Sequence, residues 1–330
     1  MSKEMNRRSF LGKSLIATTG AAALGMSFEE KALMAHQAEA AERAETREAV
    51  KGLPMGRIGD LRISRVICGS NLFGGGAHAR ELQYVSRIVG DYHTDEKVME
   101  TLQLCEENGI NTNIGAIGRV NQYNRERGGK MQVIGQLGPS AEDPIGDAQE
   151  AVDGGAIGAF IWGKRAEDLV QANRLDVIEK FVSFLQKNGA IGGVGAHDWR
   201  VVAACEKADI NVDFYFKTIH HDNYWSAYPK ETRRPYRVDS FAADDKDCMW
   251  EQFPEETIEV MKKVKKPWIG YKVLAAGAIH PEEGFKFAFA GGADFVCAGM
   301  FDFQVREDVL IAKKTLAEDE VKNRARPWRA

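Results

Sequence analysis

The chain has 330 residues, of which 44% are hydrophobic and 28% are charged, and its net charge at pH 7 is −4. This is an ordinary globular composition, which excludes wholesale disorder. The slightly acidic balance argues against a nucleic-acid partner held on a basic surface. The five cysteines are scattered without a Cys-x-x-Cys pair, so a disulfide scaffold is excluded and a structural zinc knot is disfavoured.

Residues 1–40 predict a targeting segment and linker rather than part of the fold. The pair Arg7 and Arg8 is followed by a mildly apolar run over residues 15–26, which is too short and too rich in Gly, Ala and Thr to span a bilayer. The pattern resembles a twin-arginine export signal, with a basic N-terminal arm as the alternative. We therefore expect export to a periplasm or an equivalent compartment, no stable membrane span once the signal is removed, and one folded domain over residues 50–330.

Short apolar runs alternate with amphipathic stretches along the rest of the chain. Most runs are continuous rather than alternating, which is typical of strands covered on both faces. Eight such β/α units in a domain of this length predict an α/β fold of the closed (β/α)8 TIM-barrel type, with an open doubly wound sheet as the alternative. The expected strands lie at residues 65–69, 110–114, 131–137, 156–162, 191–196, 213–219, 268–274 and 294–299.

The segments between these strands carry further local signals. Helical patterns cover residues 93–108 and 167–188, and each ends at a glycine that suits a helix C-cap. A small hairpin over residues 55–64, with Gly-Asp at its tip, precedes the first strand and is expected to plug the bottom of the barrel. The C-terminal run over residues 316–330 is predicted to be a solvated helix and tail.

In parallel barrels the chemistry lies at the carboxyl ends of the strands. Polar or aromatic residues follow nearly all the expected strands, which predicts a ligand site at that end of the barrel. Four of them are expected to contact the substrate: Asn71, Asn113, Gln136 and Trp162.

The connection over residues 220–253 is long and rich in aromatic residues, which include Tyr224 and Trp225. A connection of this length is usually functional, and aromatic faces suit stacking on sugar rings. These two residues are therefore predicted to bind a sugar-like small molecule. A small core within the loop and a dimer contact are the alternative interpretations.

His197, His220 and Lys272 follow three neighbouring strands and are expected to face one another. Imidazole accepts and donates protons near neutral pH, and a lysine beside an apolar wall can act as a base or a Schiff-base nucleophile. We interpret these three residues as the catalytic candidates. The alternative is structural, with the histidines hydrogen-bonded to loop backbone and Lys272 paired with a carboxylate.

A metal site is a further hypothesis, because His220, His221 and Asp222 supply suitable ligands opposite His197. Adjacent residues on a strand point to opposite faces, so His220 and His221 share one ion only if the strand has already ended. The sequence contains no His-Glu-x-x-His motif. We therefore assign no metal ligand.

Four motifs resemble, in their order and spacing, those of the aldo/keto reductase superfamily. They are GRIGDLRISRVICGSNLFGG, GINTNIGA, VGAHDW and YKVLAAG, and the resemblance covers most of residues 55–315. It implies a TIM barrel with an N-terminal hairpin and, in typical members, carbonyl reduction by a nicotinamide cofactor. It does not extend to the family's tetrad of Asp, Tyr, Lys and His, whose matched positions hold Ile114, Arg119, Gln136 and Trp162.

The cofactor site that the resemblance implies is only partly matched. Tyr271 corresponds to the aromatic residue that stacks on the nicotinamide, and Asp198 lies in the pair that replaces the carboxamide-binding residues, so both are cofactor-binding candidates. Phe216 replaces a Gln of that site. Gln304 and Asp308 take the positions of the phosphate-binding Arg and Asn. No cofactor is assigned, and NADP is expected to bind weakly or not at all.

Three functional hypotheses follow from these observations. The first is an exported enzyme with an aldo/keto reductase-like barrel that acts on a sugar or a small carbonyl or polyol compound by acid/base chemistry. The second is an NAD(P)-dependent oxidoreductase with a non-standard site. The third is a non-catalytic sugar-binding module.

Overall fold

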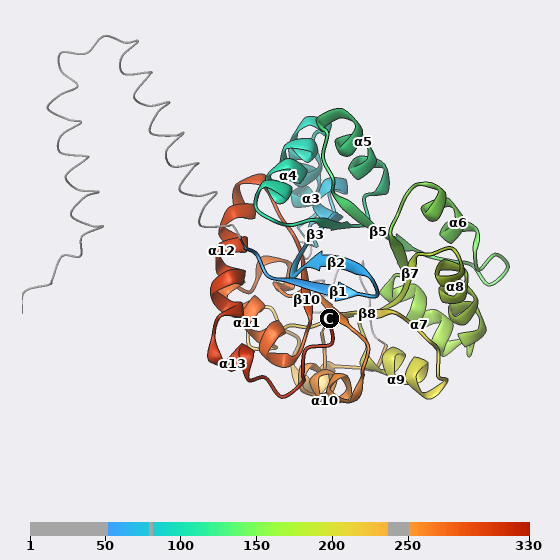
Figure 1. The fold of residues 1–330 in the computed structure, drawn as a ribbon. Helices are drawn as coiled ribbons and strands as arrows, with labels where there is room; N and C mark the ends of the chain where they lie inside the picture. Colours follow the sequence, from blue (N-terminus) through green and yellow to red (C-terminus); the bar gives the residue numbers. More distant parts are fainter. Residues whose placement is uncertain (1–51, 79–81, 237–250) are drawn as a thin grey trace, which may run out of the picture. The chain divides into compact units, whose positions relative to one another are not determined.

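The computed structural model describes residues 52–78, 82–236 and 251–330. Within these ranges, eight parallel strands close into a barrel in the order β10-β3-β4-β5-β6-β7-β8-β9 (Figure 1). The strands are β3 (Val66–Gly69), β4 (Thr112–Ile114), β5 (Gln132–Leu137), β6 (Gly158–Ile161), β7 (Ile191–Ala196), β8 (Phe214–Thr218), β9 (Trp268–Tyr271) and β10 (Phe295–Gly299). The predicted TIM barrel is confirmed, whereas the expected targeting segment lies outside the described residues.

Each apolar run of the sequence contains one of these strands. The reason is that a barrel strand packs side chains inward against the other strands and outward against helices. Along β3, Ile67 belongs to the interior cluster, whereas Val66 and Cys68 belong to the layer beneath the helices. All residues of β7 and β8 are buried.

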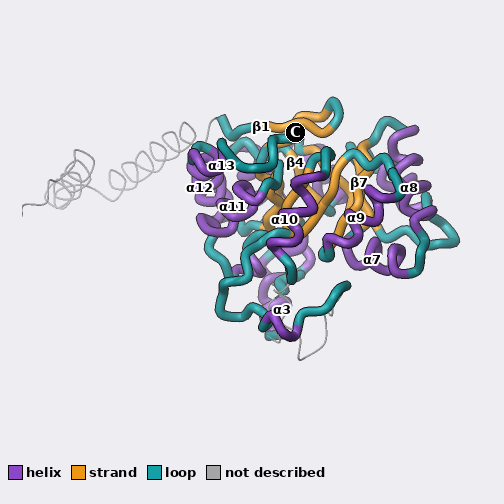
Figure 2. The backbone as a smooth tube through the Cα atoms, turned by 90° about the horizontal axis from the view of Figure 1, so that it is seen from below, coloured by secondary structure: helices purple, strands orange, loops and turns teal. Residues whose placement is uncertain are grey.

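A two-stranded hairpin covers the amino-terminal end of the barrel. β1 (Met55–Ile58) pairs antiparallel with β2 (Leu61–Ser64). Ile58 and Ile63 are 0% exposed and join the interior cluster, so the hairpin plugs the bottom of the barrel as expected. Figure 2 shows the hairpin and α3 (Gln83–Tyr92) at opposite ends of the barrel, which places α3 at the end where the strands finish.

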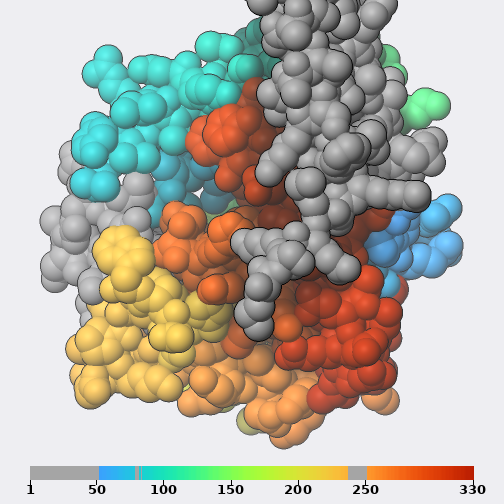
Figure 3. All heavy atoms as spheres, turned by 90° about the vertical axis from the view of Figure 1, so that its left-hand side faces the viewer, coloured from blue at the N-terminus to red at the C-terminus, as the bar shows by residue number. Residues whose placement is uncertain are grey.

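Helices follow the strands and cover the outside of the barrel. They are α4 (Asp95–Glu107), α5 (Ile117–Arg127), α6 (Gly146–Asp153), α7 (Gly163–Gln171), α8 (Leu175–Lys187), α9 (Trp199–Lys207), α10 (Pro254–Lys263), α11 (Pro281–Gly291), α12 (Val305–Leu316) and α13 (Asp319–Lys322), with 3-10 turns η2 (Asn71–Gly74), η3 (Lys230–Thr232), η4 (Ala275–Gly277) and η5 (Asp302–Gln304). On one flank, α11, α12 and α13 pack side by side, in orange to red (Figure 3). No helix within the described ranges is long and apolar enough to cross a membrane.

The helical pattern at residues 167–188 forms two helices rather than the one predicted, because the chain turns between α7 and α8. Asn173 in this turn has a φ of 55°, a left-handed conformation that Asn tolerates better than most residues. The hydrophobic pattern continues across the turn and therefore hides it. The glycines expected to cap helices, Gly109 and Gly189, have φ values of 87° and 74°, as predicted.

The C-terminal tail is anchored to the barrel, so the prediction of a solvated tail is wrong. Asp294, just before β10, is fully buried and accepts hydrogen bonds from Arg324 Nη2 at 2.9 Å and Arg326 Nη1 at 2.7 Å. The guanidinium carbons of Arg65 and Arg324 lie 4.4 and 3.5 Å from the centre of the Trp328 ring. Pairing and stacking make this burial of charge possible, and neither is visible in a hydrophobicity pattern.

Removing the carboxylate that holds this tail should destabilise the protein. In Asp294→Asn, the buried guanidinium groups of Arg324 and Arg326 lose their counter-charge, and we expect the free energy of unfolding to fall by about 3–5 kcal/mol. Urea titration followed by circular dichroism measures the change. Lys286→Met, which removes a half-exposed partner of Glu318, is the control and should leave the urea midpoint nearly unchanged. Equal midpoints for the two variants would contradict the role of Asp294.

The buried carboxyl group of Asp308, in α12, makes the stability of the protein depend on pH. Burial raises the pKa of Asp308 to about 7 from an ordinary value of 3.8. A carboxyl group with a raised folded-state pKa keeps its proton in the folded chain and loses it in the unfolded chain, so its contribution to stability falls as the pH rises from about 4 to above about 7.

Asp308→Asn cannot ionise and should not lose this stability. We expect its free energy of unfolding, relative to the parent, to be about 2–4 kcal/mol higher at pH 8 than at pH 4. Denaturant unfolding of both proteins at the two pH values measures the difference. If the free energy of unfolding changed equally with pH in the variant and the parent, Asp308 would ionise normally in the folded chain.

Candidate functional site

One buried carboxylate organises the carboxyl ends of β6 and β7. Glu167 is 0% exposed and lies one turn into α7. Its Oε1 accepts hydrogen bonds from the backbone amides of His197 at 2.7 Å and Asp198 at 3.1 Å, and from His197 Nδ1 at 3.2 Å. Because a carboxylate can only accept, Nδ1 carries the ring proton. The basic nitrogen of His197 is therefore Nε2.

Tyr271, at the end of β9, contacts the same histidine. Its ring stacks on Phe216 with centroids 4.1 Å apart, and its centroid lies 5.6 Å from that of His197. A Cβ atom on Gly163 would lie 2.8 Å from the Tyr271 hydroxyl oxygen and 2.6 Å from His197 Nδ1, so the glycine leaves the space in which the two side chains meet. Burial raises the pKa of Tyr271 well above its ordinary value, and the phenol therefore stays protonated.

A second pair of side chains meets at this end of the barrel. Lys272 follows β9, and its Nζ donates to His78 Nε2 at 3.2 Å. The side-chain amide of Asn71 donates to the same nitrogen at 3.3 Å. His78 and Lys272 have φ values of 48° and 55°, which are strained for residues with side chains. Strained backbone of this kind clusters at functional sites. The pair is therefore a candidate part of the site.

Both histidines of the site are neutral near pH 7. Burial, assisted by the charge of Lys272, lowers the pKa of His78 to about 3. Burial also lowers the pKa of His197, against the opposing effect of Glu167. The site thus places two neutral imidazoles close to the amino group of Lys272, a combination of proton acceptor and cation that suits acid/base chemistry.

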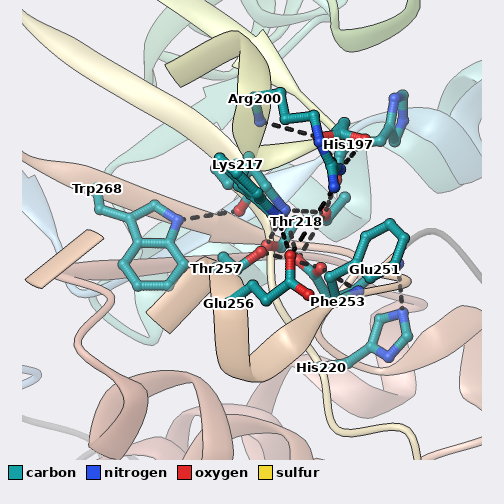
Figure 4. Close-up of polar contacts among 12 residues, drawn as sticks. His197, Arg200, Lys217, Thr218, His220, Glu251, Phe253, Glu256, Thr257 and Trp268 are labelled. Atoms are coloured by element: carbon teal, nitrogen blue, oxygen red, sulfur yellow. Dashed lines mark hydrogen bonds and ion pairs between the residues drawn. The ribbon is translucent and has the colours of Figure 1, made fainter. Parts of the chain in front are cut away.

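A buried polar network holds the backbone of His197 from the side of β8 (Figure 4). Lys217 is 0% exposed; its Nζ donates to Thr218 Oγ1 at 2.8 Å and forms an ion pair with Glu251. The Thr218 hydroxyl donates to the carbonyl of His197 at 3.1 Å. His197 is thus held through its amide by Glu167 and through its carbonyl by Thr218.

His220 belongs to this network. Its Nε2 accepts a hydrogen bond from the amide of Glu251 at 3.1 Å, and its Nδ1 donates to the carbonyl of His221 at 2.8 Å. Backbone groups therefore engage both ring nitrogens, and burial lowers the pKa of His220 to about 3. In this arrangement His220 anchors the return of the long loop, and its part in proton transfer stays a prediction.

The residues predicted to bind substrate lie around the same end of the barrel in different environments. Asn113 is fully buried and bonds to the backbone of Cys68 and Ala116, so it braces the turn after β4. Gln136 is exposed near the end of β5, and Trp162 is 38% exposed just before α7.

The aromatic loop after β8 is described in part. The ring of Tyr224 packs edge-on against His220 with centroids 5.5 Å apart, whereas Trp225 is 75% exposed. Residues 237–250 of this loop lie outside the described residues. Trp225 is therefore the better placed of the two predicted aromatic residues to meet a ligand from solvent.

The residues of the metal hypothesis make separate contacts. Asp222 pairs with Arg233 at 2.8 Å, and His221 Nδ1 accepts from the amide of Asn223 at 3.3 Å. In the part of the chain that the structure describes, no group of three or more His, Cys, Asp or Glu side chains is arranged to hold a metal ion.

The sequence does not predict Glu167 as a site residue, and it indicates His78 only as part of a glycine-rich loop that suits a ligand. Glu167 lies within a helical pattern, where a charged residue normally faces solvent. Its place on the same stripe as Gly163 and Ala166 is the one signal that could reveal it, because this stripe faces the core. His78 lies in a glycine-rich loop, and no periodic pattern marks it.

No protein-family model and no curated protein matches the chain. Among solved structures 46 chains match, and they include two structures from Pseudomonas aeruginosa, each named a "putative aldo-keto reductase". One is 16% identical and covers 80% of this chain and 94% of its own, with a TM-score of 0.52. The other is 16% identical and covers 80% of this chain and 95% of its own, with a TM-score of 0.51. This likeness shows an aldo-keto reductase-like TIM barrel, a fold that carries many unrelated activities.

The nicotinamide dinucleotide used by aldo/keto reductases does not fit the residues at its expected phosphate position. Gln304 Oε1 accepts a backbone hydrogen bond at 3.2 Å, and the first turn of α12 carries Glu307 and the buried Asp308. The exposed carboxylate of Glu307 repels a phosphate from the positive end of the helix dipole, and neither residue supplies a cation. At the carboxamide position, Asp198 caps α9 and bonds to Arg200 through both oxygens.

The acidic turn at the phosphate position predicts that NADPH binds poorly. We expect fluorescence titration of the purified protein to show no saturation up to about 100 μM NADPH. Glu307→Arg reverses one charge at the surface of this turn and should tighten binding if the repulsion is the cause. A parent Kd in the low micromolar range would contradict this reading of the α12 turn.

Proposed function

We propose that the protein is an exported enzyme that acts on a sugar or another small carbonyl or polyol compound by acid/base chemistry. The observation that carries the proposal is the convergence of two neutral histidines, His197 and His78, and Lys272 at the carboxyl end of the barrel. Active sites of TIM barrels lie at this end. Export is supported by the twin-arginine-like pair Arg7 and Arg8.

His197 is the proton acceptor in this proposal. Its lowered pKa keeps Nε2 unprotonated at neutral pH, ready to take a proton from a hydroxyl group or from a carbon next to a carbonyl. Glu167 fixes the ring through Nδ1 and stabilises the imidazolium that forms. Thr218 and Glu167 together hold the backbone, so the base keeps one position through the reaction.

Lys272 supplies the positive charge. A substrate oxygen that gains negative charge as the proton leaves is stabilised by a cation in a partly buried site. His78 accepts a hydrogen bond from the ammonium and so fixes its direction. As a neutral imidazole it does this without adding a second positive charge.

Exposed aromatic side chains support a sugar as the substrate. Trp162 follows β6 and Trp225 lies in the loop after β8, with exposed fractions of 38% and 75%. Both belong to connections at the carboxyl end of the barrel, and indole faces suit the apolar faces of sugar rings. The same observation favours a second candidate function, a sugar-binding module without turnover.

Solvent exchange tests the acid/base proposal even when the reaction product is unidentified. Aldoses, ketoses and polyols are incubated with the protein in D2O, and the substrate protons are followed by NMR. His197→Gln and Lys272→Met should each lower the rate of exchange or turnover by about a hundredfold or more. Lys286→Met makes the same change at a half-exposed position of α11, away from the candidate site, and should retain the parent rate.

The outcome separates the two candidate functions. Parent-like rates in His197→Gln, with an unchanged melting temperature, would overturn the acid/base proposal. Binding of a sugar without exchange or turnover, abolished in Trp225→Ala, would establish the binding module instead.

A further inference from the structure

Two buried polar atoms beside His197 have no hydrogen-bond partner among the described residues. They are the hydroxyl oxygen of Tyr271 and Oε2 of Glu167. Proteins satisfy the large majority of buried polar side-chain atoms, because an unsatisfied one costs free energy. One of the two groups is a phenol that can donate, and the other is a carboxylate oxygen that can only accept. The two groups are therefore complementary.

Both groups approach the first turn of α7. Gly163 and Glu167 are four residues apart, so they share a helix face, and a helical side chain leans back over the preceding turn. The space above Gly163 is also where the Tyr271 hydroxyl lies, 2.8 Å from the position of a Cβ atom. His197 Nδ1, which is bonded to Glu167, lies 2.6 Å from that position. The missing side chain of Gly163 thus lets all three groups converge.

Two features of its surroundings favour Glu167 as the partner of the phenol. One face of the Tyr271 ring stacks on Phe216, which offers no acceptor. After burial, the negative charge of Glu167 is the largest cause that raises the pKa of Tyr271. The phenol therefore lies within the electrostatic field of the same carboxylate that holds His197.

We propose that Tyr271 is a positioning residue whose hydroxyl donates to Glu167 Oε2, directly after a small side-chain rotation or through one bridging water. Tyr271, Glu167 and His197 then form one hydrogen-bonded chain. A donor on Oε2 draws charge from the oxygen that faces His197 and so lowers the proton affinity of the imidazole. The inference rests on the proposed function, because it assigns how the base His197 is tuned.

NMR titration of His197 in the resting protein tests the chain of hydrogen bonds. Tyr271→Phe removes only the hydroxyl and should raise the pKa of His197 by about half a unit, with the signal assigned by comparison with His197→Gln. Tyr215→Phe is the matched control, because Tyr215 is a buried phenol that donates to Glu206 Oε1 at 2.7 Å and packs in the layer beneath the helices, not in the interior cluster that contains Phe216 and Tyr271. This control should leave the His197 titration unchanged.

A double-mutant cycle tests whether the two groups interact. Tyr271→Phe should lower the melting temperature of the parent and have much less effect in Glu167→Gln. Additive effects together with an unchanged His197 titration would overturn the proposal. If Glu167→Gln fails to fold, the titration of Tyr271→Phe decides alone. Both measurements use the protein without substrate, so their failure is distinct from a failure to find turnover.

Discussion

The buried carboxylate of Glu167 is the constraint on which the candidate site depends. Burial of a carboxylate is costly unless donors surround it, and here the backbone amides of His197 and Asp198 and the His197 ring provide three hydrogen bonds. The same bonds fix the chain after β7, the orientation of the imidazole and its tautomer. Glu167 reaches them because α7 begins directly after β6 at Gly163, where a side chain would collide with the His197 ring.

The barrel carries its compensated buried charges at one end and the candidate site at the other. At the amino-terminal end, the hairpin fills the interior, and Asp294 joins Arg324 and Arg326 into a buried network whose charges are compensated. At the carboxyl end, His78 and Lys272 adopt strained backbone conformations. The stabilising contacts at the amino-terminal end offset the free-energy cost of the strained backbone at the carboxyl end. In this way TIM barrels support different sites on one scaffold.

The fold could be predicted because its signals are local: continuous apolar runs, glycines at helix ends and a hairpin with Gly-Asp at its tip. His197 and Lys272 each follow a predicted strand, so the sequence also places them at the carboxyl end of the barrel. Glu167 and His78 could not be found in this way, because their roles depend on contacts with residues 30 and 194 positions away. The position of His220 follows from the strand before it. Its hydrogen bond with Glu251 could not be predicted, because it depends on where the long loop brings Glu251 back to the barrel.

The tautomer of His197 tests most directly whether Glu167 prepares a base at this site. Long-range ¹H–¹⁵N NMR spectra of the resting protein at neutral pH report which ring nitrogen carries the proton. We expect a neutral ring with the proton on Nδ1 and an unprotonated Nε2, as the bond to Glu167 Oε1 requires. A proton on Nε2 alone, or a doubly protonated ring at neutral pH, would contradict this account of the site.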